Sequence, residues 1–432
     1  IISKSALDKN KLRAREWRTH TKYIIFAFKQ QENMEQLNLI IDTYQRIILE
    51  SESQLAKVKR HIYRIGTLRL ILFAAGVAGI IYFWSEGRLV ISGIAAITFI
   101  PFLLLVKLHN RLFRQKDYLE KKIEINRQEL QAIAYDTSAF DNGKEFIDPA
   151  HLYTYDLDVF GEHSLFQYIN RTATQPGKKR LAEWMNTHLK NKAEIEKRQE
   201  AVKELAPELE MRQHFRILGL LHKGKTADEE EIRNWATSPE YYRKKWYFRT
   251  LAILVPLANA VCLGLAIAGV ISFTTWGIVF AGIGLLSSSF SKGVSQMQSV
   301  YGKKMQILTT YAHLIHIIEE KEMESSALKR VKGLVGGEKQ TASQAVKRLT
   351  ALMNALDQRN NMLMQFVLNG LFFWELRQVM KIETWKESFA ANLPHWLEAI
   401  GEMDAYCSLA TFAYNHPGYV FPEIASKLFC ME

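Results

Sequence analysis

Four apolar runs interrupt a chain whose remaining residues are largely polar. They come as two pairs, 70–84 with 89–106 and 251–271 with 277–290, and none of the four contains an ionised residue. At a rise of about 1.5 Å per residue, the run 251–271 is about 31 Å long, which matches the hydrocarbon core of a bilayer. Because only a few residues separate the members of each pair, the pattern predicts two membrane-spanning helical hairpins.

The charges that flank these runs are strongly asymmetric. Arg88 is the only basic residue in the two short connections, whereas sixteen basic residues flank the hairpins on their outer ends. By the positive-inside rule, the long segments are expected in the cytoplasm and the protein in the cytoplasmic membrane. An alternative is two apolar hairpins buried in a large soluble core, for which the asymmetry would be accidental. The sixteen residues are Lys57, Lys59, Arg60, Arg64, Arg69, Lys107, Arg111, Arg114, Lys116, Arg243, Lys244, Lys245, Arg249, Lys292, Lys303 and Lys304.

Outside the four runs, apolar residues recur at the spacing of an α-helix. Long polar helices are expected at 34–64 and 107–134, whereas 135–161 is the main segment without a helical period. The fold class expected is therefore all-α. Two amphipathic stripes, typical of helices packed on helices, are Met305, Leu308, Ala312 and Ile315, and Ala345, Leu349, Leu352 and Leu356.

Composition narrows the function classes only slightly. The chain has 432 residues and a net charge of +11, but the hairpin flanks account for sixteen of its basic residues, and the others form no compact patch with interleaved aromatic residues. Cys262, Cys407 and Cys430 are far apart and belong to no C-x-x-C motif, which argues against a disulfide framework or a thiolate zinc site. A start at Ile1 rather than Met is typical of a fragment.

One motif resembles a nucleotide-binding loop. Gly219, Gly224, Lys225 and Thr226 match the spacing G-x-x-x-x-G-K-[ST], in which backbone amides and the lysine bind phosphates. That loop must follow a buried β-strand, but the preceding residues are charged and helical in period, and Asp228 begins an acidic run that would repel phosphates. We therefore reject it as a cofactor site and expect no cofactor bound to this chain.

No other constellation predicts catalysis or metal binding. His313, His316 and Glu320 lie one turn apart and could in principle hold a metal, but the sequence offers no further ligand and the positions fall within a packing stripe. The sequence also has no visible Ser/His/Asp or Cys/His arrangement. No catalytic residue is therefore assigned.

Two segments contain a dense set of motif residues. Segment 156–185 has an aromatic-Gly step, a Ser-Leu pair, a short polar motif and a helix ending in Trp, and segment 396–424 has two acidic residues, Ser-Leu-Ala and a Pro-Glu pair. The motif residues are Asn170, Arg171, Thr172, Glu402, Asp404, Pro422 and Glu423. Both segments resemble the core and lever region of the MutS family of DNA mismatch repair ATPases. With 195–205 and a long helix around 354–375 between them in the expected order, the resemblance covers about 150–425.

The resemblance implies a domain organisation. In this family a DNA-gripping clamp lies at the tip of the lever, and here an apolar hairpin occupies that place. The family's mismatch-reading N-terminal domain has no counterpart, and its phosphate loop would lie beyond residue 432. The expected order is 1–64 cytoplasmic helices, 65–106 first hairpin, 107–149 helix and connection, 150–250 outgoing core, 251–290 second hairpin, and 291–432 returning lever and core.

The function implied is that of a membrane-anchored MutS-like protein whose lever region couples a downstream ATPase to its partner. The ATPase domain would use ATP and Mg²⁺, and the family's shared ATP sites imply a homodimer. Because both DNA-reading elements look missing, DNA binding is expected to be weak and nonspecific, with the lipid bilayer as main partner. An alternative is a membrane scaffold or interaction protein with a MutS-like core that does not read DNA.

Overall fold

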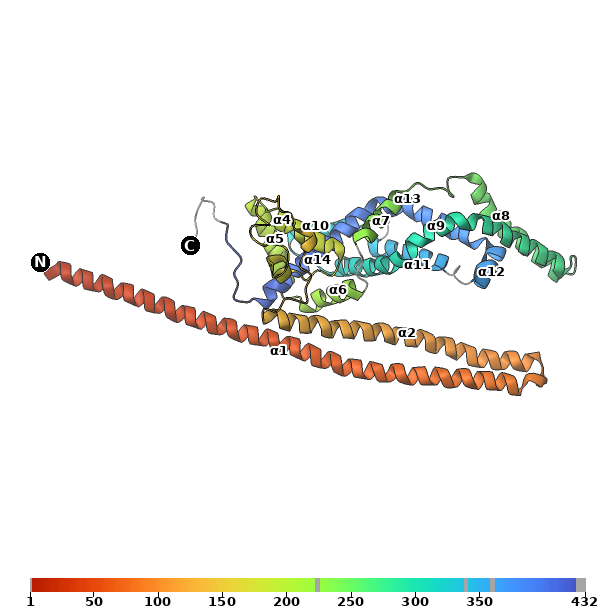
Figure 1. Ribbon diagram of the computed structural model, residues 1–432, viewed down its shortest axis with the longest axis horizontal. Helices are drawn as coiled ribbons and strands as arrows, with labels where there is room; N and C mark the ends of the chain where they lie inside the picture. Colours follow the sequence, from red (N-terminus) through yellow and green to blue (C-terminus); the bar gives the residue numbers. More distant parts are fainter. Residues whose placement is uncertain (1, 222–225, 338–340, 358–361, 425–432) are drawn as a thin grey trace. The chain divides into compact units, whose positions relative to one another are not determined.

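The chain folds into helices that form two compact units. The computed structural model describes residues 2–221, 226–337, 341–357 and 362–424, and these contain no β-strand. The all-α fold class is thereby confirmed for the described residues (Figure 1). The first unit comprises the described parts of 1–147, 155–169 and 409–432, and the second comprises 148–154 and 170–408.

The first unit is built on one long helical hairpin. Its helices are α1 (Ile2–Tyr82) and α2 (Arg88–Ile133), which pack along each other and are joined by the short 3-10 helix η1 (Trp84–Glu86) (Figure 1). The expected polar helices at 34–64 and 107–134 are thus continuous with the apolar runs beside them. The segment 135–161 contains only the 3-10 turn η2 (Lys144–Phe146), and α3 (Leu165–Ile169) follows it.

A buried polar chain joins the hairpin to the end of α14 (Leu393–Asn415). The hydroxyl of Tyr44 donates to Oδ1 of Asn415 at 2.7 Å, and Nδ2 of Asn415 donates to the carboxylate of Glu129 at 2.8 Å. Tyr44 and Asn415 are both buried. Because the Tyr44 hydroxyl and the Asn415 side-chain amide are hydrogen-bonded, the hairpin packs on the end of α14 without leaving these buried polar groups unsatisfied.

The second unit is a bundle built around one helix of 48 residues, α9 (Phe273–Glu320). The helices α8 and α12 pack beside its beginning, and α11 along its later part. Leu308, Ala312 and Ile315 on α9 and Ala345 and Leu349 on α11 are buried, which confirms these stripe positions as packing faces. The helices of this unit are α4 (Gln175–Asn186), α5 (Lys192–Leu205), α6 (Leu209–Leu221), α7 (Thr226–Thr237), α8 (Trp246–Ile267), α9, α10 (Ser326–Val335), α11 (Ala342–Asp357), α12 (Met362–Phe372), α13 (Trp374–Phe389), the 3-10 turn η4 (Ala390–Asn392) and most of α14.

The prediction of a single helix around 354–375 is wrong. The described residues form α11 up to Asp357, α12 over Met362–Phe372 and α13 from Trp374 onward. Phe373 has a φ of 51°, in the left-handed region, so no α-helix can continue through it. The periodicity of the apolar residues continues across the break, which is why the sequence pattern did not indicate it.

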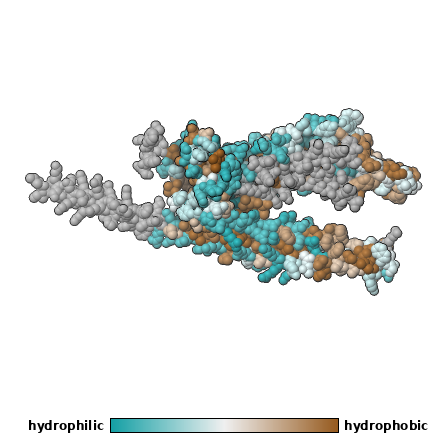
Figure 2. All heavy atoms as spheres, viewed as in Figure 1, coloured by the Kyte–Doolittle hydropathy of each residue, from teal (hydrophilic) through white to brown (hydrophobic). Residues whose placement is uncertain are grey.

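Several helices expose long apolar faces. Gln31–Tyr82, Leu89–Ile133 and Trp246–Ile267 are long and apolar enough to cross a membrane, and Phe273–Ser287 is apolar but shorter. Figure 2 shows hydrophobic residues gathered at the turn ends of both hairpins. At most 17% of the most apolar stretch of each long helix is buried. These helices therefore do not form the interior of a soluble core made by the described residues.

Candidate functional site

Three residues of the MutS-like motif form a tight loop against α14. The side-chain oxygen of Asn170 accepts hydrogen bonds from the amide and the hydroxyl of Thr172, at 3.0 and 2.6 Å. Such a side-chain turn fixes the backbone without regular secondary structure. The amide of Arg171 then donates to Oγ of Ser408 on α14 at 2.8 Å. The two resembling segments therefore meet in space although they lie more than 200 residues apart.

Asp404 on α14 is the centre of this contact, which we call the Asp404 junction (residues 170–174 and Asp404). Its carboxylate accepts from the amide of Ala173 at 3.1 Å, and from the amide and hydroxyl of Thr174 at 2.8 and 2.7 Å. The Thr174 hydroxyl in turn accepts from the amide of Gly177 at 3.0 Å, as an N-cap of α4. One carboxylate thus fixes both the loop and the start of the next helix.

The electrostatics of Asp404 argue for a structural role. Burial raises its pKa to about 6, against the hydrogen bonds from Thr174 and Ala173 and the charge of Arg216, which favour the carboxylate. The side chain is only 1% exposed and both oxygens accept hydrogen bonds. Its hydrogen-bonding capacity is therefore used to hold the loop 170–174 and the start of α4.

Glu402 joins three helices through ion pairs. It lies on α14 with 4% of its side chain exposed, contacts Nη2 of Arg330 on α10 and lies 3.9 Å from Nη2 of Arg180 on α4. A buried carboxylate needs such partners, because an unpaired charge there would be costly. One turn further along α14, Tyr406 packs on the ring of Trp184 with 4.7 Å between centroids. These contacts place Glu402 in the packing of the bundle.

The remaining motif residues, Pro422 and Glu423, belong to the first unit. Both are exposed and follow the end of α14, whereas the Asp404 junction belongs to the second unit. Within the second unit, the structure brings together Asn170, Arg171, Thr172 and Asp404.

The phosphate-loop look-alike begins inside a helix. Gly219 belongs to α6, and a Cβ atom at this position would lie 2.6 Å from Cβ of Ala173 in the Asp404 junction. The close packing of α6 on the loop 170–174 therefore explains why a glycine is needed at position 219. Gly224 and Lys225 lie outside the described residues, and Thr226 is the first residue of α7. A helix thus stands where a nucleotide-binding loop needs a strand.

His316 on α9 lies beside two glutamates of the same helix. Nε2 of His316 lies 3.3 Å from Glu320, and Nδ1 lies 3.9 Å from Glu319. Within the described ranges, no group of three or more His, Cys, Asp or Glu residues is arranged to hold a metal ion. Cys407 is buried, and burial raises the pKa of its thiol to about 12, which keeps the sulfur protonated and unreactive.

A second polar contact, which the sequence pattern did not indicate, holds the segment in front of α8. Glu383 on α13 accepts from three successive backbone amides, those of Tyr241, Tyr242 and Arg243, at 2.9, 3.0 and 2.6 Å. Glu383 is 3% exposed. Three amides converging on one carboxylate fix the backbone direction of this segment just before the apolar helix begins.

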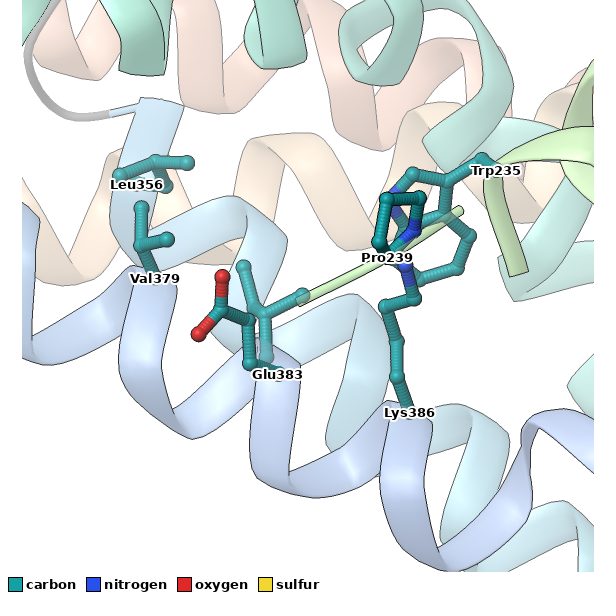
Figure 3. Close-up of a pocket in the computed structure, with 7 residues that line it drawn as sticks. Trp235, Pro239, Leu356, Val379, Glu383 and Lys386 are labelled. Carbon is teal, nitrogen blue, oxygen red and sulfur yellow. The ribbon is translucent and has the colours of Figure 1, made fainter. Parts of the chain in front are cut away.

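Lys386 completes this contact, which we call the α13 anchor (Glu383 and Lys386). Its ammonium group donates to the carbonyl and the hydroxyl of Ser238 at 2.7 and 2.8 Å. It also lies 5.2 Å from the ring centroid of Trp235, and Figure 3 shows it extending from α13 toward Trp235 and Pro239. Burial lowers the pKa of Lys386, and the charge of Glu383 opposes that shift. The buried face of α13 also carries Glu375 and Gln378, so the sequence pattern did not distinguish Glu383 and Lys386 from its other polar residues.

Comparison with known proteins connects these features to a family. No curated protein and no solved structure gives a significant match. The family profile of MutS domain III matches residues 151–410, a span that includes the Asp404 junction, Glu402 and the α13 anchor. Since this match covers more than half of the chain, the protein belongs to the MutS family.

Proposed function

We propose that this chain is the membrane-anchored core and lever region of a MutS-like protein. The observation that supports this most directly is the position of the second apolar hairpin. Residues 246–287, formed by α8 and the start of α9, are apolar and largely exposed, and they lie inside the span 151–410 matched by MutS domain III. A domain III with an exposed apolar hairpin within it is suited to a bilayer, because apolar surface of that extent is costly in water.

Charge and aromatic residues support one orientation. Sixteen basic residues flank the hairpins on the side of the long segments, and Arg88 is the only basic residue in the two connections. Trp84, Trp246 and Tyr247 are exposed at the ends of the apolar stretches, where amphipathic rings prefer the membrane interface. In this orientation both compact units lie mainly in the cytoplasm, and the protein resides in the cytoplasmic membrane.

The α13 anchor is the proposed coupling element between the core and the membrane. Glu383 and Lys386 attach α13 to the segment 238–243, three residues before α8 begins. A shift of α13 would therefore move the start of the second hairpin. We propose that an ATPase domain following residue 432, with ATP and Mg²⁺, drives this movement in a homodimer. Sequencing the coding region beyond this point tests that part, since the family's G-P-N-x-x-G-K-S motif must be found there.

DNA is a minor partner in this proposal. The sixteen flanking basic residues lie next to the proposed bilayer, where each is attracted to anionic lipid. The same charges would give weak, salt-dependent contacts to the phosphates of DNA. Titration of the detergent-solubilised chain with matched and mismatched duplexes at physiological salt should show equal affinities. A reproducible tenfold preference for the mismatch, about 1.4 kcal/mol, would contradict it.

Membrane anchoring is tested by extraction and by labelling. The protein should stay with membranes through high-salt and carbonate washes and dissolve only in detergent. In a variant without native cysteines, Glu86→Cys in the first connection should react with a membrane-impermeant maleimide added outside the cell. Asn354→Cys, exposed on α11, is the matched control and should react only after lysis. Recovery of a soluble chain without detergent would refute the proposal.

A further inference from the structure

The short apolar helix α12 has an unusual position beside the second hairpin. It contains 11 residues, Met362–Phe372, with no ionised side chain, and it packs on both α8 and α9. At about 1.5 Å per residue the described helix is about 16 Å long, half of what is needed to cross a hydrocarbon core of about 30 Å. Through α11 before it and α13 after it, α12 connects on both sides to the bundle.

Two glycines allow α12 to dock closely on α9. A Cβ atom on Gly284 of α9 would lie 2.8 Å from the ring of Phe366 of α12, and one on Gly370 of α12 would lie 2.5 Å from the ring of Phe280 of α9. Each glycine therefore receives a phenylalanine of the other helix. The two rings also meet edge to face with 5.4 Å between centroids. Small residues that admit a neighbouring helix are typical of helix pairs in membranes.

The end of α12 obtains its hydrogen bonds from protein atoms. The side-chain amide of Asn259, buried in the middle of α8, donates to the carbonyl of Gly370 and accepts from Nε1 of Trp276 at 2.9 Å. The carbonyl of Gly370 is among the last four of the helix, which have no partner within it. Oδ1 of Asn369 accepts from the amide of Glu375 at 3.0 Å across the break to α13. In a membrane no water is present to bond to the free backbone groups at a helix end, so these groups must find hydrogen-bond partners within the protein.

Three apolar side chains of α12 are only partly covered by the described residues. Phe366, Val367 and Phe372 are 42 to 45% exposed. Through Asn259, α12 is attached to α8, whose own side chains Leu254, Leu257 and Val261 are exposed as well. We propose that α12 is a third membrane element, a re-entrant helix that enters the bilayer from the cytoplasmic side, and that lipid acyl chains cover the three α12 side chains. This proposal rests on the membrane anchoring proposed above.

The test places a fluorescent probe at three positions of the full chain in phosphatidylcholine–phosphatidylglycerol vesicles. In a variant without native cysteines, the probe is attached at Val367→Cys on α12, at Leu257→Cys on the exposed face of α8, and at Thr384→Cys on the exposed face of α13. Two quenchers are compared, a lipid with a nitroxide on its acyl chain and iodide in the water. We expect the lipid quencher to remove most of the fluorescence at 257 and 367, and iodide to act mainly at 384.

The outcomes separate the two proposals. If the lipid quencher fails at Leu257→Cys, the membrane anchoring itself is wrong. If it acts at 257 but Val367→Cys behaves like Thr384→Cys, the anchoring stands and the re-entrant helix is refuted. Protection of position 367 from both quenchers would also refute it, because a protein partner would then cover α12. As a second variant, Asn259→Leu removes the donor to Gly370 and should raise iodide quenching at 367 while quenching at 257 by lipid persists.

Discussion

Replacing Asp404 by Asn should remove a distinctive pH dependence of stability. Burial raises the pKa of Asp404 from 3.8 to about 6 in the folded protein. The folded state therefore binds the proton more tightly than the unfolded state, and the free energy of unfolding that this group contributes is largest below pH 3.8 and falls as the pH rises through about 6. The full shift corresponds to about 3 kcal/mol, of which about 1.4 kcal/mol is lost between about pH 5 and 7.5.

The measurement compares unfolding of the wild type and Asp404→Asn in detergent micelles at both pH values, followed by tryptophan fluorescence. Asn keeps the shape and one acceptor oxygen but does not titrate, so the variant should lose about 1.4 kcal/mol less on raising the pH. Asp156→Asn, an exposed position, serves as control and should follow the wild type. Asp404→Ala should destabilise at every pH by about 3 kcal/mol or more, because three donors lose their acceptor. A wild-type pH dependence in Asp404→Asn would refute the argument.

Three further predictions concern single residues. Gly219→Ala should destabilise the fold by about 1–3 kcal/mol in thermal unfolding, because the new methyl group meets Ala173; an unchanged melting temperature would contradict this packing. Cys407 should resist maleimide at neutral pH and react only after unfolding, as peptide mass mapping can show. Glu383→Gln should cost about 1–3 kcal/mol and speed hydrogen exchange of the three amides that precede α8, whereas the exposed Glu387→Gln should leave that exchange nearly unchanged; equal effects would count against the α13 anchor.

The features predictable from sequence are those set by local composition. The apolar runs correspond to exposed helices because hydrophobicity over about 20 residues depends on the residues of the run alone. The stripes on α9 and α11 follow from the helical repeat for the same reason. Asn170, Arg171, Thr172 and Asp404 were identified by resemblance to a family, and their contact in the structure could not have been derived from spacing, because no local rule connects residues over 200 positions apart.

The features that escaped prediction depend on pairing between distant segments. The break at Phe373 was invisible because the apolar repeat continues through it, and only the contacts of α12 with α8 and α9 explain a separate helix there. Glu383 looked like any polar residue of an amphipathic helix until three amides from another segment were found on it. One signal was present. Asn259 is a polar side chain in an otherwise apolar run, and such residues usually bond to a neighbouring helix.

The Asp404 junction has a consequence for the time course of synthesis. Thr174 and Asp404 are 230 residues apart in the chain, so a ribosome working at about 5–20 residues per second makes the carboxylate about 10 to 50 s after the loop that depends on it. During that interval Thr174 can still cap α4, but the amides of Ala173 and Thr174 have only water as an acceptor, because the Asp404 carboxylate has not yet been made. Nascent chains stalled before residue 404 should therefore expose this loop to proteases, and C-terminal truncations that remove α14 should be degraded even though they keep every apolar helix from α1 to α12.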